Sequence, residues 1–382
     1  MNPYFGREEY AGRYSRAVRL MEAKGLSALL ITSDRNLYYF SGHQPFQPWY
    51  SMTRPTLLLM PVDREPILVA HDVWKGAAVR DTWIADVRGY TELTGVPTDW
   101  VASLFHEVGA GGGRIGVELG LEQRIGLPVA DLMALQDALP DVEWVDAAEL
   151  VWELRRIKSQ AEVECIRKSC SAVMHAFKTV FPQLRPGLTQ EEVVHRLQAA
   201  VCDAGAEPGF IIPTWDPDTN EAMACLPTRK PLEEGDLIWV DMGAVCHGYW
   251  CDYCRAASLG KPADDVLRTW EAVYRVTMTG VEAVRPGVSI SEIVRAAAAE
   301  SERQGLDLNF AAGRMGHSMG LLLTEPPSVT LEEETVLEPG MIVNLEPGIV
   351  NSEGVFIIEQ NVVVTEDGFD LLSEGPWEIW EA

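Results

Sequence analysis

The chain has 382 residues, of which 47% are hydrophobic, so it is long enough for two domains and can bury a large core. Its 57 acidic and 31 basic residues give a formal charge of −26, which argues against a nucleic-acid backbone or an anionic membrane as a partner. The opening residues MNPYFGREEY are polar and aromatic, and no apolar run approaches the ~20 residues that span a bilayer. Together with an odd number of cysteines, seven, this predicts a soluble cytoplasmic protein with reduced thiols.

The first 150 residues alternate between helical and strand-like patterns. Helices are expected at residues 9–24 and 121–139, and strands at residues 28–32, 56–60, 66–70, 114–120 and 142–146. Residues 34–42 (DRNLYYFSG) are expected to form a polar turn that runs into an aromatic patch. The triplet of glycines at residues 111–113 precedes a strand and no GK[ST] follows, so we interpret it as a flexible turn. The alternation predicts an α/β domain over residues 1–150.

A long helical pattern over residues 149–181 marks the domain boundary. Ser159 and Glu162 have the spacing of a capping box, which predicts a break near residues 158–159 and a new helix after it. The second domain is therefore expected to cover residues 151–382.

The second domain contains a repeat. Residues 185–194 read RPGLTQEEVV and residues 285–294 read RPGVSISEIV, an offset of 100 residues. Each has a Pro-Gly turn, a Thr or Ser in the N-cap position and a Glu three residues later. Any Pro-Gly turn that enters a capped helix would look similar. The alternative is a domain of two similar halves, with an active site between them.

The stretch LIWVDMGAVCHGYWCDYCR, residues 237–255, predicts two paired strands that carry Asp241 and Asp252. Two carboxylates on buried strands are unfavourable unless a positive charge lies between them, and a divalent metal ion suits carboxylate oxygens. The alternative is a pair of solvated hairpin acids. In the same stretch Cys251-x-x-Cys254 lies within a strand-like run, and with Cys246 it finds no fourth ligand at zinc-ribbon spacing, so we interpret these residues as buried thiols.

Three further polar residues lie in apolar or glycine-rich segments. Glu346 lies in MIVNLEPGIV, Glu359 lies in VFIIEQNVVV, and His317 lies between Gly316 and Gly320. Taken singly, such a histidine is more often a loop or core residue and such a glutamate an edge residue. Taken with the two aspartates, they form an oxygen-rich set with one imidazole, which suits two divalent ions bridged by carboxylates.

These residues resemble, in order and in local wording, the pita-bread family of methionine aminopeptidase, Xaa-Pro aminopeptidase, prolidase and creatinase. The matching segments are GDLIWVDMGAVCHGYWCDYCR, GHSMGLLLTEPP, LEPGMIVNLEPGIV and IIEQNVVVTEDG, and LRRIKSQAEVECIRK resembles the helix that opens the catalytic domain in the creatinase and prolidase branch. The resemblance covers most of the chain. It implies an α+β protein, with a creatinase-like N-terminal α/β domain followed by a pseudo-symmetric pita-bread catalytic domain.

The resemblance also implies roles for the five residues. Asp241 would bind one ion, Asp252 and Glu359 would bridge both ions, and His317 and Glu346 would complete the second. The ions would be manganese, cobalt, zinc or iron, a water between them would be the nucleophile, and Glu346 would accept its proton. This describes a metallohydrolase of the Xaa-Pro dipeptidase or aminopeptidase type, which cleaves a C–N bond in a dipeptide or small molecule. The same branch is commonly homodimeric.

The chain departs from the peptidase pattern at two positions. Thr324 stands where the family's peptidases usually carry a second histidine, and the loop at residues 205–232 contains no histidine at all. Thr324 can donate a hydrogen bond, but unlike histidine it cannot take up a proton and become positively charged. His247, in the turn of the central hairpin, is a possible substitute or an exposed turn residue. Arg314 and Trp215 are candidates for binding an anionic and a cationic substrate group respectively, or are surface and packing residues.

These departures leave other functions open. One is a non-peptidase member of the family that hydrolyses an unusual or cyclic amide. Another is a lyase such as the family's enzyme for dimethylsulfoniopropionate, although Gly243 occupies the place where that lyase adds an acidic ligand. A third is a catalytically silent binding protein on the same fold, against which five intact ligands argue.

Overall fold

The chain forms two compact units, Met1–Arg155 and Arg156–Ala382. A computed structural model describes residues 5–44, 54–215, 226–308, 313–351 and 354–382. The expected boundary at residue 150 falls inside helix α6 (Ala148–Arg156), and the second unit begins where that helix ends. Helix α7 (Gln160–Val180) follows with the capping box predicted from the sequence, in which Ser159 and Glu162 each accept the other's main-chain N–H.

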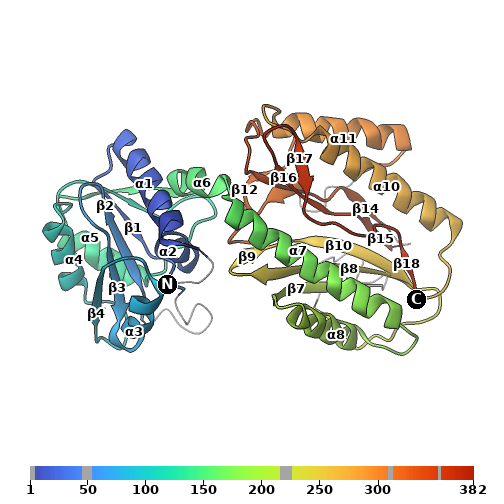
Figure 1. The fold of residues 1–382 in the computed structure, drawn as a ribbon, viewed down its shortest axis with the longest axis horizontal. Coiled ribbons are helices and arrows are strands. Elements are labelled where there is room, and N and C mark those ends of the chain that lie inside the picture. Colours follow the sequence, from blue (N-terminus) through green and yellow to red (C-terminus); the bar gives the residue numbers. More distant parts are fainter. Residues whose placement is uncertain (1–4, 45–53, 216–225, 309–312, 352–353) are drawn as a thin grey trace. The chain divides into compact units, whose positions relative to one another are not determined.

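The N-terminal unit is built on a six-stranded sheet in the order β4-β3-β2-β1-β5-β6. Its strands are β1 (Ala28–Ile31), β2 (Leu57–Pro61), β3 (Ile67–His71), β4 (Asp86–Tyr90), β5 (Arg114–Val117) and β6 (Glu143–Asp146). Its helices before α6 are α1 (Arg7–Ala23), α2 (Asp34–Ser41), α3 (Asp72–Asp81), α4 (Thr98–Glu107) and α5 (Val129–Ala138). Leu30 and Ile115 of the sheet share one buried core with Phe105 of α4 and Leu135 of α5, while α1 and α2 lie on the other face of the sheet (Figure 1).

Residues 34–41 form helix α2, and the prediction of a polar turn there is wrong. Ser33 caps the helix by accepting a hydrogen bond from the Asn36 N–H, and Gly42 ends it at a positive φ of 77°. The buried carboxylate of Glu118 accepts bonds from the Asn36 amide at 2.6 Å and from the Ser33 hydroxyl at 2.6 Å. The helix therefore depends on a carboxylate more than 80 residues away, which local sequence reading cannot find.

The expected helix at residues 121–139 is shorter than predicted. Helix α5 begins only at Val129, after Pro128 in the N-cap position. A residue before proline is disfavoured in helical geometry, and Glu122 has a positive φ of 55°, so the chain before Val129 cannot continue the helix. Helices α3 and α4 and strand β4, between residues 72 and 107, were not predicted from the sequence.

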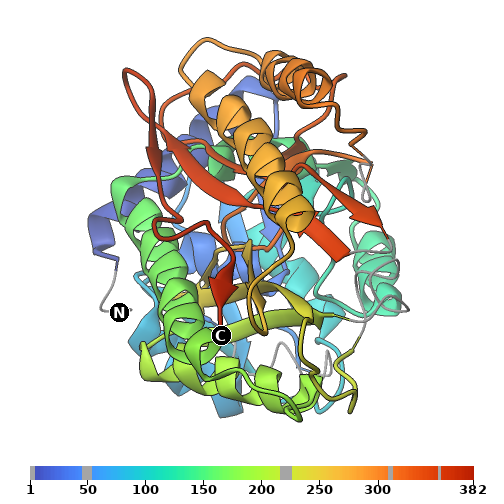
Figure 2. The same ribbon diagram turned by 90° about the vertical axis from the view of Figure 1, so that its right-hand side faces the viewer.

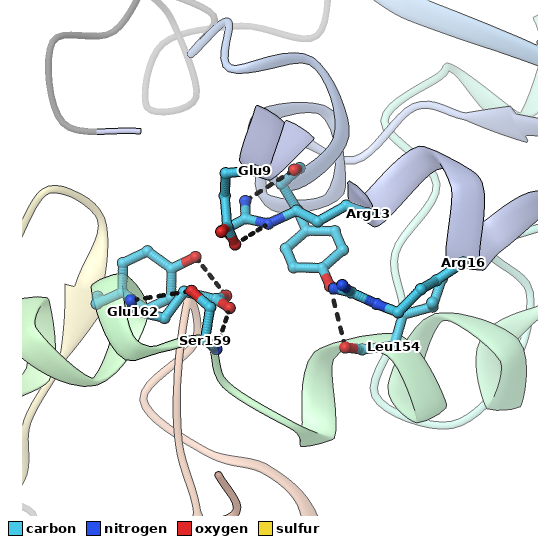
Figure 3. A network of polar contacts seen from close by, with 8 residues as sticks. Glu9, Arg13, Arg16, Leu154, Ser159 and Glu162 are labelled. Carbon is cyan, nitrogen blue, oxygen red and sulfur yellow. Dashed lines mark hydrogen bonds and ion pairs between the residues drawn. The ribbon is translucent and has the colours of Figure 1, made fainter. Parts of the chain in front are cut away.

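A buried arginine joins the first helix of this unit to the second. The Arg13 guanidinium bonds the Glu9 carboxylate at 3.2 Å and the main-chain oxygen of Tyr39 at 2.9 Å (Figure 3). The Tyr39 hydroxyl in turn donates to the main-chain oxygen of Leu154 at 3.0 Å, which attaches α6 to the same network.

The C-terminal unit places its strands between two pairs of helices, α7 and α8 on one side and α10 and α11 on the other (Figures 1 and 2). One sheet has the order β18-β10-β8-β7, with β9 paired to β8, and the other has the order β12-β11-β13-β16-β17. The remaining helices are a 3₁₀ turn (Phe181–Gln183), α8 (Gln190–Asp203), α10 (Asp264–Ala283) and α11 (Ile290–Gln304). The strands are β7 (Glu207–Thr214), β8 (Leu237–Cys246), β9 (Tyr249–Trp250), β10 (Tyr253–Ser258), β11 (Gly316–Ser318), β12 (Glu325–Ser328), β13 (Ile342–Leu345), the hairpin β14 (Gly348–Asn351) and β15 (Gly354–Ile357), β16 (Gln360–Val364), β17 (Phe369–Leu371) and β18 (Trp380–Glu381).

The sequence repeat corresponds to a repeated local structure. Thr189 and Ser289 begin α8 and α11 with matching capping boxes. Gly187 N–H donates to the oxygen of Leu232, and Gly287 N–H donates to the oxygen of Leu337, both at 2.9 Å. The two turns therefore have the same conformation and bind equivalent later segments, which confirms a domain of two similar halves.

The central stretch forms paired strands, as predicted, with β8 turning at residues 247–248 into β9 and then β10. Tyr249 anchors this turn to α7, because its hydroxyl donates to the Glu162 carboxylate at 2.7 Å (Figure 3) and its main-chain oxygen accepts from Ser169 at 2.9 Å. Cys251 and Cys254 are fully buried free thiols.

Among the helices that the structure describes, none combines the length and apolar character needed to cross a membrane.

Candidate metal centre

The first sheet supplies the two aspartates. Asp241 lies in the middle of β8, opposite Ile212 of β7 and Cys254 of β10. Asp252 follows Cys251 in the short gap between β9 and β10. The buried carboxylate of Asp252 is 7% exposed.

The second sheet supplies the other three residues. In β13, Val343 and Leu345 pack into the core formed with α10 and α11. Because side chains alternate along a strand, residues 344 and 346 point to the opposite face, and Glu346 follows the end of β13 on that face. His317 of β11 lies directly across from Asn344 and shares this face. Glu359 immediately precedes β16.

The five predicted ligands converge. One oxygen each from Asp241, Asp252 and Glu359 can be chosen so that all three lie within 4.8 Å of one another. His317 Nε2 lies 3.3 Å from Asp252 Oδ2 and 3.8 Å from Glu346 Oε1. Residues separated by more than 100 positions in the sequence thus form one cluster with four carboxylates and one imidazole.

The cluster is electrostatically unfavourable without a cation. Burial, followed by the charges of Asp252 and Glu346, raises the pKa of Asp241 well above its usual value. Burial also raises the pKa of Glu359, with further contributions from Asp241, Asp252 and Glu346. One oxygen each of Asp241, Asp252 and Glu359 is buried and has no hydrogen-bond partner among the described residues. Unsatisfied, mutually repelling carboxylate oxygens are the donor set that divalent metal ions require, so the residues fit such ions.

His317 is oriented for binding through one nitrogen. Its Nδ1 lies 2.9 Å from the main-chain oxygen of Ser318, which can only accept, so Nδ1 carries the proton. Burial lowers the pKa of His317, which favours the neutral ring. Nε2 therefore presents its lone pair towards Asp252 and Glu346, as a metal-binding histidine must.

Two residues that the sequence reading did not single out hold the ligands in place. The Asn361 amide donates to the main-chain oxygen of Asp252 at 2.6 Å, and its oxygen accepts from the Asp252 N–H at 3.4 Å. The buried Arg255 donates to the main-chain oxygen of Glu359 at 3.1 Å. For Asn361 a signal was available, because it lies two residues after Glu359 in an apolar run and therefore shares its face.

Arg314 and Trp215, the two candidates for substrate binding, have different surroundings. Arg314 donates to the Ser328 hydroxyl at 3.2 Å, and Ser328 lies across from His317 on the next strand, so the guanidinium lies near the cluster. The pKa of Asp252 is raised by burial and by Glu346, and the positive charge of Arg314 opposes this rise. Trp215 follows β7 and is buried, and its indole N–H has no partner among the described residues.

Thr324 and His247, the two residues considered as replacements for the peptidases' histidines, lie at different distances from the cluster. Thr324 is half-buried and immediately precedes Glu325, which lies across from Ser318, the neighbour of His317. His247 is exposed at the turn after β8, at a positive φ of 51°. Roughly 16 Å of strand separates Asp241 from the end of β8, so the structure does not bring His247 to the cluster and we assign it no part in the chemistry.

A buried ion pair supports the segment that contains Thr324. Lys158 Nζ lies 3.2 Å from Glu325 Oε2, and both side chains are 1% exposed. The other oxygen of Glu325 accepts from the Leu322 N–H at 3.2 Å. The buried carboxylate of Glu325 therefore fixes the main chain of the segment between β11 and β12.

Comparison with known proteins shows which family the chain belongs to. Residues 164–366 match the model of metallopeptidase family M24, and residues 13–157 match that of the creatinase/prolidase N-terminal domain. The chain is 29% identical to the probable dipeptidase PepE of Mycobacterium tuberculosis, over 98% of this chain and 97% of that protein, and 24% identical to the ectoine hydrolase of Halomonas elongata, over 98% of each. The crystal structure of dipeptidase PepE from Mycobacterium ulcerans superposes with a TM-score of 0.83 at 28% identity, covering 98% of both chains. The chain therefore belongs to metallopeptidase family M24 and carries the creatinase/prolidase N-terminal domain.

Proposed function

We propose that this member of family M24 is a dinuclear-metal-dependent dipeptidase of the Xaa-Pro type. The observation that carries the proposal is the convergence of Asp241, Asp252 and Glu359. One carboxylate oxygen from each lies within 4.8 Å of the others, and each residue has one buried oxygen without a hydrogen-bond partner among the described residues. Asp252 and Glu359 would bridge two ions, Asp241 would hold one, and His317 with Glu346 would hold the other. When bound, two divalent ions would supply a water of lowered pKa and would polarise the carbonyl of the amide.

Glu346 is the ligand placed to move protons. Its side chain is 23% exposed, whereas those of His317 and Asp252 are 2% and 7% exposed. It can therefore reach both the attacking water and the substrate. In amide hydrolysis the water oxygen bonds to the carbonyl carbon, the C–N bond breaks, and Glu346 takes the proton of the water and returns it to the departing nitrogen. Thr324 would donate a hydrogen bond where other family members use histidine.

Arg314 and Trp215 would bind the substrate. The guanidinium of Arg314 lies at the β12 side of the cluster and suits a carboxylate, such as the C-terminus of a dipeptide. The buried indole of Trp215 would provide an apolar wall with one N–H donor for the substrate. Both roles favour a short substrate with a free carboxylate.

The test is hydrolysis of a panel of Xaa-Pro dipeptides and matched Xaa-Ala dipeptides by protein loaded with manganese, cobalt or zinc, followed by mass spectrometry. The matched controls are the same protein in excess chelator and the Asp252→Asn variant. We expect cleavage of the dipeptides that both controls abolish. Cleavage that persists in the chelator would contradict a metal-dependent reaction at this site.

One observation favours a second candidate, a hydrolase of a small non-peptide amide. The chain lacks a histidine at residue 324 and throughout residues 205–232, and a relative of similar length is named for the hydrolysis of ectoine. Intact dipeptides in a sample that binds two ions per chain would support this candidate. The same loaded protein would then be tested on cyclic and N-acyl amides, ectoine included.

A further inference from the structure

Asn344 has an unusual position in the second sheet. It lies in the middle of β13 and is 0% exposed, yet both its amide nitrogen and its amide oxygen lack hydrogen-bond partners among the described residues. A buried amide that makes no hydrogen bond is unfavourable, because it has lost the bonds that water would make with it. Such a residue calls for a partner that the described part of the protein chain does not itself supply.

The face on which Asn344 lies indicates where that partner would be. Val343 and Leu345 point into the core with α10 and α11, so Asn344 points to the face that carries the ligands. It is directly across from His317 on one neighbouring strand and from Asn361 on the other. His317 and Asn361 both serve the metal cluster, the first through Nε2 and the second through the main chain of Asp252.

The three side chains therefore form a row across β11, β13 and β16. The outer two are satisfied, since His317 Nδ1 bonds Ser318 and the Asn361 amide bonds Asp252. Asn344, between them, is not satisfied. The strands on both sides hold the main chain of Asn344 in place, so a partner for its amide must lie next to it on this face.

We propose that Asn344 is a positioning residue of the metal centre, whose amide hydrogen-bonds an ordered water that enters with the divalent ions. This inference rests on the proposed function, because it requires that ions bind. Divalent ions bring coordinated or neighbouring water into a site, and a buried amide with a free donor and a free acceptor can fix one such water. Without the ions this water would be absent, and the amide would lack its partner.

The experiment uses a pair of variants that differ by one group. Asn344→Thr replaces the amide by a hydroxyl that can still donate and accept, and Asn344→Val places a methyl group where threonine has that hydroxyl. Both residues are β-branched and suit a strand. Ile342→Val, on the same face of the same strand, is the matched control for a change of volume. The full-length chain is stripped of metal, and manganese affinity is measured by titration calorimetry together with the thermal midpoint before and after loading.

We expect Asn344→Val to bind manganese 10- to 100-fold more weakly, as loss of an outer-sphere partner generally does. Its midpoint without metal should equal or exceed that of the wild type, and its gain on loading should be smaller. Asn344→Thr should recover at least half of the lost affinity on a logarithmic scale, and Ile342→Val should bind as the wild type does.

Equal affinities for the wild type, Asn344→Thr and Asn344→Val would overturn the inference. A lowered midpoint of the metal-free Asn344→Val protein with unchanged affinity would also overturn it, because the amide would then serve the fold alone. Absence of manganese binding by the wild type would instead refute the proposed function, and the inference with it.

Discussion

The side chain of Asn361 makes two hydrogen bonds with the main chain of Asp252. Its amide nitrogen donates to the Asp252 oxygen at 2.6 Å, and its amide oxygen accepts from the Asp252 N–H at 3.4 Å. Asp252 lies between two short strands and is the acid that approaches both Asp241 and His317. The side-chain amide of Asn361, in the second sheet, thus holds the main chain of Asp252, a ligand from the first sheet, in position. The position of Asp252 depends on a residue 109 positions later in the chain.

Asn361→Ala should therefore weaken metal binding without removing any ligand. The main-chain groups of Asp252 would lose their partner, which costs about 1–3 kcal/mol in a buried site. We expect a 10- to 100-fold loss of manganese affinity and a lower thermal midpoint. Calorimetric titration of the stripped variant checks the first expectation, and an affinity equal to that of the wild type would show that Asp252 is held by other contacts.

The metal-free protein should lose stability as pH rises. Burial, and in each case the nearby carboxylate of Glu346, raises the pKa values of Asp241, Asp252 and Glu359, so the folded state binds protons that the unfolded state has released. The contribution of these groups is fully present below their ordinary pKa near 4 and is lost as pH rises towards the raised values. Asp252→Asn removes one of the repelling charges. Its metal-free midpoint at pH 7 should exceed that of the wild type, by about 2–4 °C for each kcal/mol of relieved repulsion.

Thermal melting in excess chelator from pH 5 to pH 8 measures this difference. The exposed acid substitution Glu366→Gln is the control and should leave the profile unchanged. A midpoint of Asp252→Asn below that of the wild type across this range would mean that the acids do not repel one another in the folded chain.

The buried pair of Lys158 and Glu325 should show strong coupling. Lys158→Met leaves a carboxylate that is 1% exposed without its cation, which costs about 3–5 kcal/mol. The double variant Lys158→Met/Glu325→Gln removes the charge that is left behind and should melt at a higher temperature than Lys158→Met alone. Additive losses from the two single variants would contradict a direct pair.

Arg314→Gln should raise KM for dipeptides by roughly 10- to 100-fold, the effect of losing a hydrogen bond between charged groups. Its kcat should change less, and hydrolysis of the same dipeptides with an amidated C-terminus should be equal in variant and wild type. Arg295→Gln, an exposed arginine of the same unit paired to Glu334 at 3.6 Å, is the control. A proportional loss on free and amidated substrates would show that Arg314 does not bind the carboxylate.

The sequence predicted the four carboxylate ligands because each is a charged residue in or beside an apolar strand pattern, where burial without a partner is unfavourable. Asp241 and Glu359 could be found in this way, as could the capping boxes at Ser159 and Thr189, whose partners lie three residues away. Helix α2 was missed although Ser33 and Gly42 are local signals for its ends, because its polar residue Asn36 looks like part of a turn until its buried partner Glu118, far along the chain, is known.

The uncharged residues of the centre were harder to find. Asn344 and Asn361 are neutral and lie in strands of ordinary composition, and only the strand register places them beside His317 and Asp252. Period-2 alternation counted from Glu346 and Glu359 would have placed both on the ligand face. The partner that each side chain meets depends on pairings between strands, which the sequence does not display.

The most direct test of the central claim is a count of metal ions per chain against catalytic activity. Protein stripped and then reloaded with manganese would be analysed by elemental mass spectrometry, alongside Asp252→Ala, Glu359→Ala and the exposed control Glu366→Gln, with hydrolysis of an Xaa-Pro dipeptide followed in each sample. The account predicts two ions per chain and chelator-sensitive cleavage for the wild type and the control, and loss of both ions and activity together in the two ligand variants. Cleavage that survives in either ligand variant, or a wild type that holds no ion, would contradict it.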